Sequence, residues 1–139
     1  MIPNGSATIF NKYIDTSGAE QYLGTIIPQV VWWGPRGVRI TRQGLIAANT
    51  WNVMIPHGML VNFLDFQAWQ ALPLLSKPTK WTLQEGDWMV YGSVSDAIIP
   101  GTFSVTQLKA KYPEVGQIIS VDPMDQGNMN MRFTRAWLK

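Results

Sequence analysis

The stretch that decides the fold is WTLQEGDWMVYGSV at residues 81–94, followed by FSVTQLKAKY at 103–112 and GQIISVDPMDQGNMNMRFTRAWLK at 116–139. The first and third segments are rich in β-branched and aromatic residues. They are interrupted by Gly, Pro, Asp and Asn, which is typical of short strands joined by turns. The C-terminal half therefore predicts strands on both sides of one different element.

That element is a short helix. Ser104 can accept a hydrogen bond from the backbone of Gln107 while Gln107 reaches back, which is a capping box. Phe103 can pack on Leu108 as a hydrophobic staple, and Pro113 ends the helix. One helix at about 104–112 among strands predicts a mainly β fold, a small barrel or sandwich, with a helical crossover.

The N-terminal half predicts further strands. Residues 7–14 (ATIFNKYI) and about 21–33 form a hairpin in which residues 15–18 (DTSG) supply the turn. Pro28 lacks a backbone donor, so we expect a bulge or an edge position in the second arm, and a break in the strand there. Further predictions are a tight turn at Gly34, Pro35 and Gly37 and short strands at Val38–Thr41 and Thr50–Ile55.

The segment from about 56 to 78 breaks this pattern and is expected to be a long insertion, whose local structure is left open among a short helix, a loop and a packed lid. Its sequence HGMLVNFLDFQAWQALPLL has one acidic residue, no Lys or Arg, and no clean period of two. Two interpretations stay open. The apolar side chains fill a core, or the segment protrudes and docks on a neighbouring subunit. The residues concerned are Leu60, Phe63, Leu64, Phe66, Trp69 and Leu72.

Composition limits the function classes. The 139 residues fit a single domain, 1–139, with 46% hydrophobic but only 14% charged residues. So little charge predicts a surface with uncharged and aromatic groups that suits standing contacts with other subunits. The net charge of +2 does not indicate a nucleic-acid binder by itself. The absence of cysteine excludes disulfides and thiolate metal sites, and no segment is long and apolar enough to suggest a membrane span.

No residues form a recognisable catalytic or metal-binding pattern. His57 is the only histidine, so it lacks an orienting partner or a metal cluster. Asp122 and Asp125 could form an acid pair or bind a hard cation, but their spacing across a proline favours a turn, and no third carboxylate lies near in the sequence. We therefore expect no catalytic residues, no metal, no cofactor and no small-molecule substrate.

Aromatic and basic residues are the remaining candidates for binding. Seven tryptophans could stack on sugars or bases, although a role in the core and in subunit contacts is favoured. Trp32 and Trp33 are adjacent, so in a strand they point to opposite faces. Arg36, Arg39 and Arg42 form the densest positive cluster. One interpretation is that these arginines are simply solvated. The other is that they are repeated around a ring of identical subunits and face phosphate groups there.

Six segments, in this order, resemble a family of small structural proteins of tailed bacteriophages and prophages of Gram-positive hosts, encoded among the head-to-tail joining genes. They are TIFNKY (8–13), TIIPQVVWW (25–33), RITRQGLIAANTWNVMIP (39–56), KWTLQEGDWMVYGSV (80–94), TQLKAKY (106–112) and IISVDPMDQGNMNM (118–131). The likeness covers most of the chain. In that family a His-Trp pair commonly follows, whereas Phe133 and Thr134 stand here.

The resemblance implies a neck component similar to stopper or head-closure proteins, which look like small β-barrels with a long loop assembled as rings around the DNA channel. The expected partners are further copies of the chain, portal or adaptor proteins, tail proteins and, without sequence specificity, double-stranded DNA in the channel. The expected location is the virion neck, after synthesis in the bacterial cytoplasm. Expected subunit contacts are Trp32, Trp33, Phe63, Phe66 and Trp69, with Arg36, Arg39 and Arg42 facing DNA or a partner.

Two other classes are weighed against this one. A carbohydrate-binding β-sandwich would use surface tryptophans as a platform for sugar rings. A hydrolase would need paired carboxylates or a nucleophile with a base, and a single histidine with few acids supplies little for either.

Overall fold

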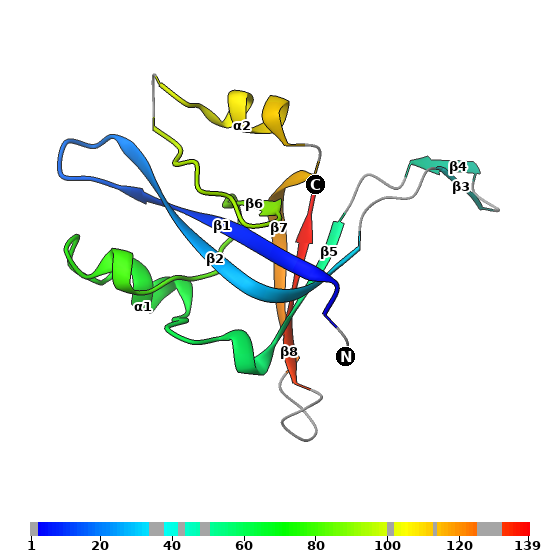
Figure 1. Ribbon diagram of the computed structural model, residues 1–139, viewed down its shortest axis with the longest axis horizontal. Helices are drawn as coiled ribbons and strands as arrows, with labels where there is room; N and C mark the ends of the chain where they lie inside the picture. The colour runs from blue at the N-terminus through cyan, green and yellow to red at the C-terminus, as the bar shows by residue number, and fades with distance from the viewer. Residues whose placement is uncertain are drawn as a thin grey trace.

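The computed structural model describes residues 3–33, 38–41, 44–47, 51–99, 102–112, 114–124 and 132–139. Its central feature is a closed antiparallel barrel in the order β1-β2-β5-β8-β7-β6, with β6 pairing back onto β1 (Figure 1). The strands are β1 (Gly5–Ile14), β2 (Glu20–Trp33), β5 (Trp51–Pro56), β6 (Trp88–Tyr91), β7 (Val115–Met124) and β8 (Phe133–Leu138). The mainly β fold with a barrel is therefore confirmed.

The predicted N-terminal hairpin is confirmed, but its predicted break is wrong. β2 runs through Pro28 without interruption. Between the pairs Ala7–Ile27 and Gly5–Val30, β2 has one residue more than β1, so the proline lies in a β-bulge. Proline has no N–H, and at the bulge the strand ladder requires no hydrogen bond from this position. Beyond the bulge, the side chain of Asn4 forms hydrogen bonds with both the N–H and the C=O of Trp32, each 2.9 Å long.

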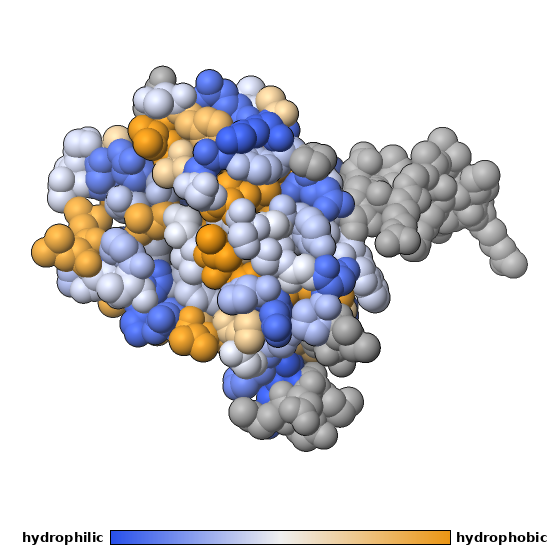
Figure 2. Space-filling view, in the orientation of Figure 1, coloured by the Kyte–Doolittle hydropathy of each residue, from blue (hydrophilic) through white to orange (hydrophobic). Residues whose placement is uncertain are grey.

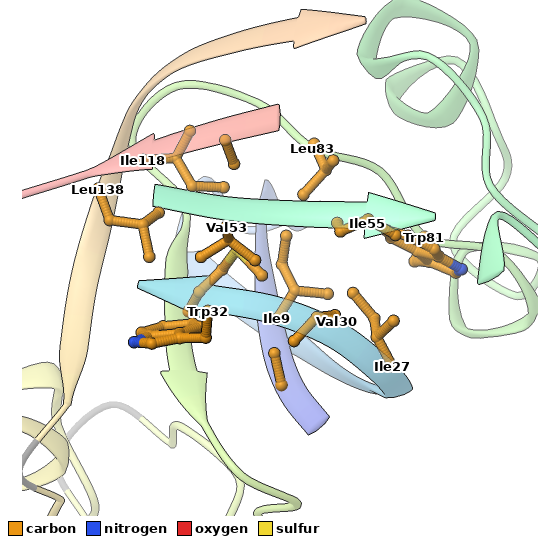
Figure 3. Packing of buried hydrophobic residues seen from close by; sticks show 13 residues of the cluster. Ile9, Ile27, Val30, Trp32, Val53, Ile55, Trp81, Leu83, Ile118 and Leu138 are labelled. Carbon is orange, nitrogen blue, oxygen red and sulfur yellow. The ribbon is translucent and has the colours of Figure 1, made fainter. Parts of the chain in front are cut away.

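Apolar residues alternate into the barrel and fill it. Ile9, Val30 and Val53 point between the strands in Figure 3, and each is completely buried. Strand alternation places Ala7 and Ile9 of β1 inside, whereas Phe10 belongs to a second cluster outside the barrel. Burial of these side chains supplies the main favourable free energy of the barrel.

The second cluster lies under helix α2 (Val105–Lys111). The predicted capping box is present, because Ser104 Oγ accepts from the Gln107 N–H and Gln107 Oε1 accepts from the Ser104 N–H. Leu108 is completely buried and packs in the same cluster as Phe103. Local sequence signals therefore placed this helix within one residue of its ends.

The segment at 56–78, expected to be a long insertion, contains three short helical turns. They are η1 (His57–Met59), α1 (Phe66–Gln70) and η2 (Lys77–Thr79). The fold thus has a second short α-helix beside the predicted one. The predicted strand in WTLQEGDWMVYGSV is shorter than expected: β6 begins at Trp88, because Gly86 adopts a φ of 93° in the turn before it.

Two further strands form a ribbon between β2 and β5. β3 (Val38–Thr41) and β4 (Gly44–Ala47) pair with each other as a separate two-stranded sheet. In Figure 1 this β3–β4 ribbon stands away from the barrel, on the side opposite α1. The predicted strand at 38–41 is confirmed and β4 was not predicted. The predicted turn at Gly34, Pro35 and Gly37 lies outside the described residues.

Closure of the barrel depends on a close approach at Gly116. A Cβ atom added there would lie 2.6 Å from the Cβ of Leu138 and 3.1 Å from Cε3 of Trp51. We expect Gly116→Ala to lower the free energy of unfolding by about 1–3 kcal/mol, because β7 and β8 would have to separate. Gly58→Ala is the matched control, since no atom lies within 4 Å of its added Cβ. Equal thermal unfolding midpoints for the two variants would contradict this.

Candidate subunit interface

The inserted segment between β5 and β6 is anchored on the barrel by Trp69. This side chain is completely buried, and its ring meets that of Tyr13 on β1 edge to face, with 6.3 Å between ring centroids. Its Nε1 donates to the carbonyl of Lys80 at 3.1 Å. One indole therefore joins α1, the end of the inserted segment and β1.

Lys77 holds the end of α1 in place. Its Nζ donates to the carbonyls of Trp69, Gln70 and Leu72 at 2.8–3.1 Å and lies 5.0 Å from the centroid of the Trp69 ring. Burial lowers the pKa of this ammonium. A cation at the C-terminal end of a helix satisfies carbonyls that have no partner within the helix. The segment is thus a packed unit.

A buried polar cluster fixes the stretch that returns from the inserted segment to β6. Asn11 Nδ2 donates to Asp87 Oδ2 at 2.8 Å, and the N–H of Lys12 and Nε2 of Gln84 donate to Oδ1 at 3.0 and 2.9 Å. Asn11 also bonds the N–H and the C=O of Thr82. Residues 82–87 are therefore tied to β1 by side chains rather than by a strand ladder.

These anchors leave an apolar groove open on the surface. It has a volume of about 760 Å³ and lies among the start of α1, residues 83–85, and the facing ends of β7 and β8. Its lining contains two acidic residues and no basic one. The lining residues are Phe63, Asp65, Phe66, Leu83, Gln84, Glu85, Val121, Pro123 and Thr134.

The two phenylalanines of the groove are held differently. Phe63 is half-buried and packs edge to face on Trp81, with 5.0 Å between centroids. Phe66, the first residue of α1, is 50% exposed, and Asp65 before it caps the helix by accepting from the Ala68 N–H. A half-exposed aromatic ring beside an apolar groove is suited to contact with another chain.

Apolar exposure extends beyond the groove. Apolar residues gather at the edge of the molecule that α1 and its following turn occupy (Figures 1 and 2). Leu75 in that turn is 94% exposed, and Val61 is 67% exposed. A second hollow of about 350 Å³ lies between β2 and residues 58–62, but Thr25, Asn62, Thr79 and Lys80 make its lining more polar.

The five predicted contact residues divide into two groups. Trp33 and Phe66 are 57% and 50% exposed, and Phe63 lines the groove. Trp32 and Trp69 are 4% and 0% exposed, so the prediction that they face a neighbour is wrong. Strand alternation turns Trp32 into the barrel and Trp33 outward, as predicted for adjacent residues, and Trp69 is the anchor of the inserted segment.

The predicted arginine cluster is only partly described. Arg39 lies in β3 opposite Ile46 of β4, and Arg36 and Arg42 lie outside the described residues. The β3–β4 ribbon therefore carries at least the central member of the cluster away from the barrel.

The other candidates from the sequence are not assembled into a site. His57 is exposed in η1. Asp122 lies in strand β7 and not in a turn, and it accepts from Trp137 Nε1 at 3.3 Å. Asp125 lies outside the described residues. Within those residues no three His, Cys, Asp or Glu side chains come together as metal ligands.

Sequence analysis missed Lys77, the Asn11–Asp87 pair and Leu75. A signal existed for Asn11, because alternation from Ile9 places it on the inner face of β1. Leu75 lies between Leu74 and Ser76, and this local sequence does not indicate whether the two leucine side chains are buried or exposed. No helix in the described part of the chain combines the length and apolar character needed to cross a lipid bilayer.

Comparison with known protein families finds a match along nearly the whole chain. The model of a family described as "Family of unknown function (DUF6751)" matches residues 2–135. No curated protein and no solved structure matches the chain significantly.

The buried carboxyl of Asp87 gives the protein a specific pH dependence. Burial raises the pKa of Asp87 from 3.8 to about 6, although the hydrogen bonds that its carboxylate accepts act to lower the pKa. Between these values the folded chain keeps a proton that the unfolded chain releases. The free energy of unfolding therefore falls as pH rises from about 4 to 6, by roughly 3 kcal/mol from this group.

Urea unfolding of Asp87→Asn and of the wild type at several pH values checks this. We expect the decrease between pH 4 and 6 to be absent from the variant. Asp15 and Asp96, whose pKa values are lowered by hydrogen bonds from Ser17 and Lys111, lose their stabilising effect only at more acidic pH. Parallel pH profiles for the two proteins would show that Asp87 does not titrate in this window.

Proposed function

The chain belongs to the DUF6751 family of unknown function, and from its surface we propose that it is a structural subunit of the head–tail connector of a tailed bacteriophage. In this proposal it is similar to stopper or head-closure proteins. Copies form a ring around the DNA channel and join the portal or adaptor to the tail. The protein acts by assembly and not as an enzyme, and its place is the virion neck.

The apolar groove is the observation that carries the proposal. Phe63 and Phe66 stand at a hollow of about 760 Å³ whose lining has no basic residue. Each described barrel strand pairs with a neighbour on both sides along at least part of its length, so no barrel strand is left at an open edge along its whole length. A surface of this kind suits a standing contact between subunits, whose centre is apolar and poor in charge.

The two insertions of the barrel also support a connector. The β3–β4 ribbon leaves the barrel between β2 and β5, and the inserted segment with α1 leaves it between β5 and β6. Insertions of this size on a closed scaffold can reach neighbours above, below or beside a subunit. The ribbon includes Arg39, and the arginines around it are the candidates that face DNA or a partner.

A carbohydrate-binding module is less well supported. A sugar platform needs several exposed aromatic faces on one side of the protein. Of the seven tryptophans, all of which are described, only Trp33 is exposed, at 57%, and the others are buried or half-buried.

Deleting the coding sequence from the phage or prophage genome that carries it tests the proposal. We expect electron microscopy of the lysate to show separate heads and tails, because the joining ring is missing. A copy supplied in trans should restore joined particles. Normal yields of tailed particles from the deletion would contradict the proposal.

Reversing the charge of the arginine cluster tests its role. We expect the triple variant Arg36→Glu, Arg39→Glu and Arg42→Glu to lower the yield of DNA-filled, tailed particles by about tenfold or more, because several charge contacts are reversed. The matched triple change to lysine keeps the positive charge and should retain most of the yield. The idea fails if the glutamate variant packages and joins normally.

A further inference from the structure

One side of β2 is paired along only a short part of its length. β5 pairs with β2 at residues 31–33, whereas β1 pairs with β2 from Glu20 to Val30. β5 ends at Pro56, and the chain turns there into η1 instead of continuing beside β2. Within the described part of the chain, residues 21–29 therefore have a strand neighbour on one side only.

The backbone groups on the open side belong to alternate residues of β2. The N–H of Lys12 donates to the carboxylate of Asp87 and its carbonyl accepts from Gln84, so both groups point away from β2. In an antiparallel pair, the backbone groups of two facing residues point either toward each other or both away. Tyr22 faces Lys12 in the register, so its N–H and C=O point away from β1.

Alternation extends this open edge to Gly24 and Ile26, and Pro28 takes the next position, where a missing N–H costs no ladder bond. Among the described residues, no backbone group bonds to the N–H or C=O of Tyr22, Gly24 or Ile26. Residues 21–29 (QYLGTIIPQ) contain no Asp, Glu, Lys or Arg. Open edges are usually protected by charged side chains, so this uncharged edge is suited to pairing with another strand.

The hollow of about 350 Å³ lies beside this edge. One wall is formed by residues 25–28 of β2, and the inserted segment forms the other with residues 58–62 and 78–81 (Figure 1). Ile26 on the first wall is 48% exposed, and Val61 on the second is 67% exposed. A strand in this hollow, about 4.8 Å from β2, would complete the ladder and cover both side chains.

The occupant that fits this edge is a single extended peptide segment. β2 of a second copy carries β1 on its far side, so pairing between two β2 edges would need the width of two strands. Residues 58–62 and 78–81 stand where the second of those strands would lie. An extended segment needs only the width of one strand, and its backbone supplies the donors and acceptors that the edge lacks.

We infer that β2 accepts an extended segment of a neighbouring connector protein as an added strand, which pairs with Tyr22, Gly24 and Ile26 in this hollow. The inference rests on the proposed function, which supplies portal, adaptor and tail proteins as partners, and it names the site that one of them uses. Main-chain hydrogen bonds hold the segment, and the exposed side chains of Ile26 and Val61 favour apolar residues in it.

Proline at position 26 tests the site, because Ile26→Pro removes an edge N–H that the ladder with β1 does not use. Ile26→Thr is the matched control, which keeps the N–H and the β-branched shape. The probes are short overlapping peptides that cover the portal, adaptor and tail proteins of the same phage and the chain itself. We expect a segment of a partner protein to bind the wild type and Ile26→Thr alike, and Ile26→Pro about tenfold or more weakly.

Thr25→Pro checks which side of β2 is open. Thr25 faces Ile9 on β1, and its N–H belongs to the ladder between the two strands. Its loss should therefore lower the thermal unfolding midpoint far more than Ile26→Pro does. Equal changes in the midpoint would overturn the assignment of Ile26 to the open side.

Hydrogen–deuterium exchange gives a readout without any substitution. In the protein alone, the amides of Tyr22, Gly24 and Ile26 should exchange much faster than those of Leu23 and Thr25, which bond to β1. A bound segment should slow the first three and leave the other two unchanged. Protection of all five amides in the protein alone would contradict an open edge.

The outcomes separate this inference from the proposed function. The inference fails if no partner peptide binds, if Ile26→Pro binds as well as the wild type, or if only peptides of the chain itself bind. The deletion experiment decides the connector proposal independently of these results. Peptide binding at the edge of a protein whose deletion leaves tailed particles intact would remove the connector proposal and leave β2 as a site of strand addition.

Discussion

Closure of the barrel is the constraint on which the rest of the structure depends. β1 pairs with both β2 and β6, and the C-terminal β8 pairs with both β5 and β7, so no strand of the barrel is left at an open edge along its whole length. Gly116 permits the close approach of β7 to β8. In the proposed ring, the apolar groove at Phe63 and Phe66 is the surface through which copies meet.

Buried polar groups decide which surface stays open. Lys77, with three carbonyls, fixes the inserted segment on itself, and Asp87, with three donors, ties residues 82–87 to β1. Trp69 is completely buried in that attachment and has no surface left for contact with another chain. Because the segment is fixed from its inner side, Phe66 faces outward at a groove instead of collapsing onto the barrel. Isolated buried charges are costly, so their complete hydrogen bonding is what makes this arrangement possible.

Local signals allowed much of the fold to be predicted. The turn at residues 15–18 and the capping box at Ser104 act between neighbouring residues, and both elements are where the sequence places them. Residues 81–87 look like a strand but follow long-range contacts with Asn11 instead. Burial of Trp32 and Trp69, against exposure of Trp33 and Phe66, depends on which face meets the barrel, and periodicity alone does not determine that for a segment such as 57–75.

The central claim is the proposal that the apolar groove at Phe63 and Phe66 is covered by a neighbouring copy. Hydrogen–deuterium exchange, compared between dilute and concentrated protein, measures this most directly. The account predicts slower exchange on concentration at residues 63–66, 83–85 and 121–123, with the exchange of β1 and β2 unchanged. Slower exchange confined to another face, or none while oligomers form, would contradict it.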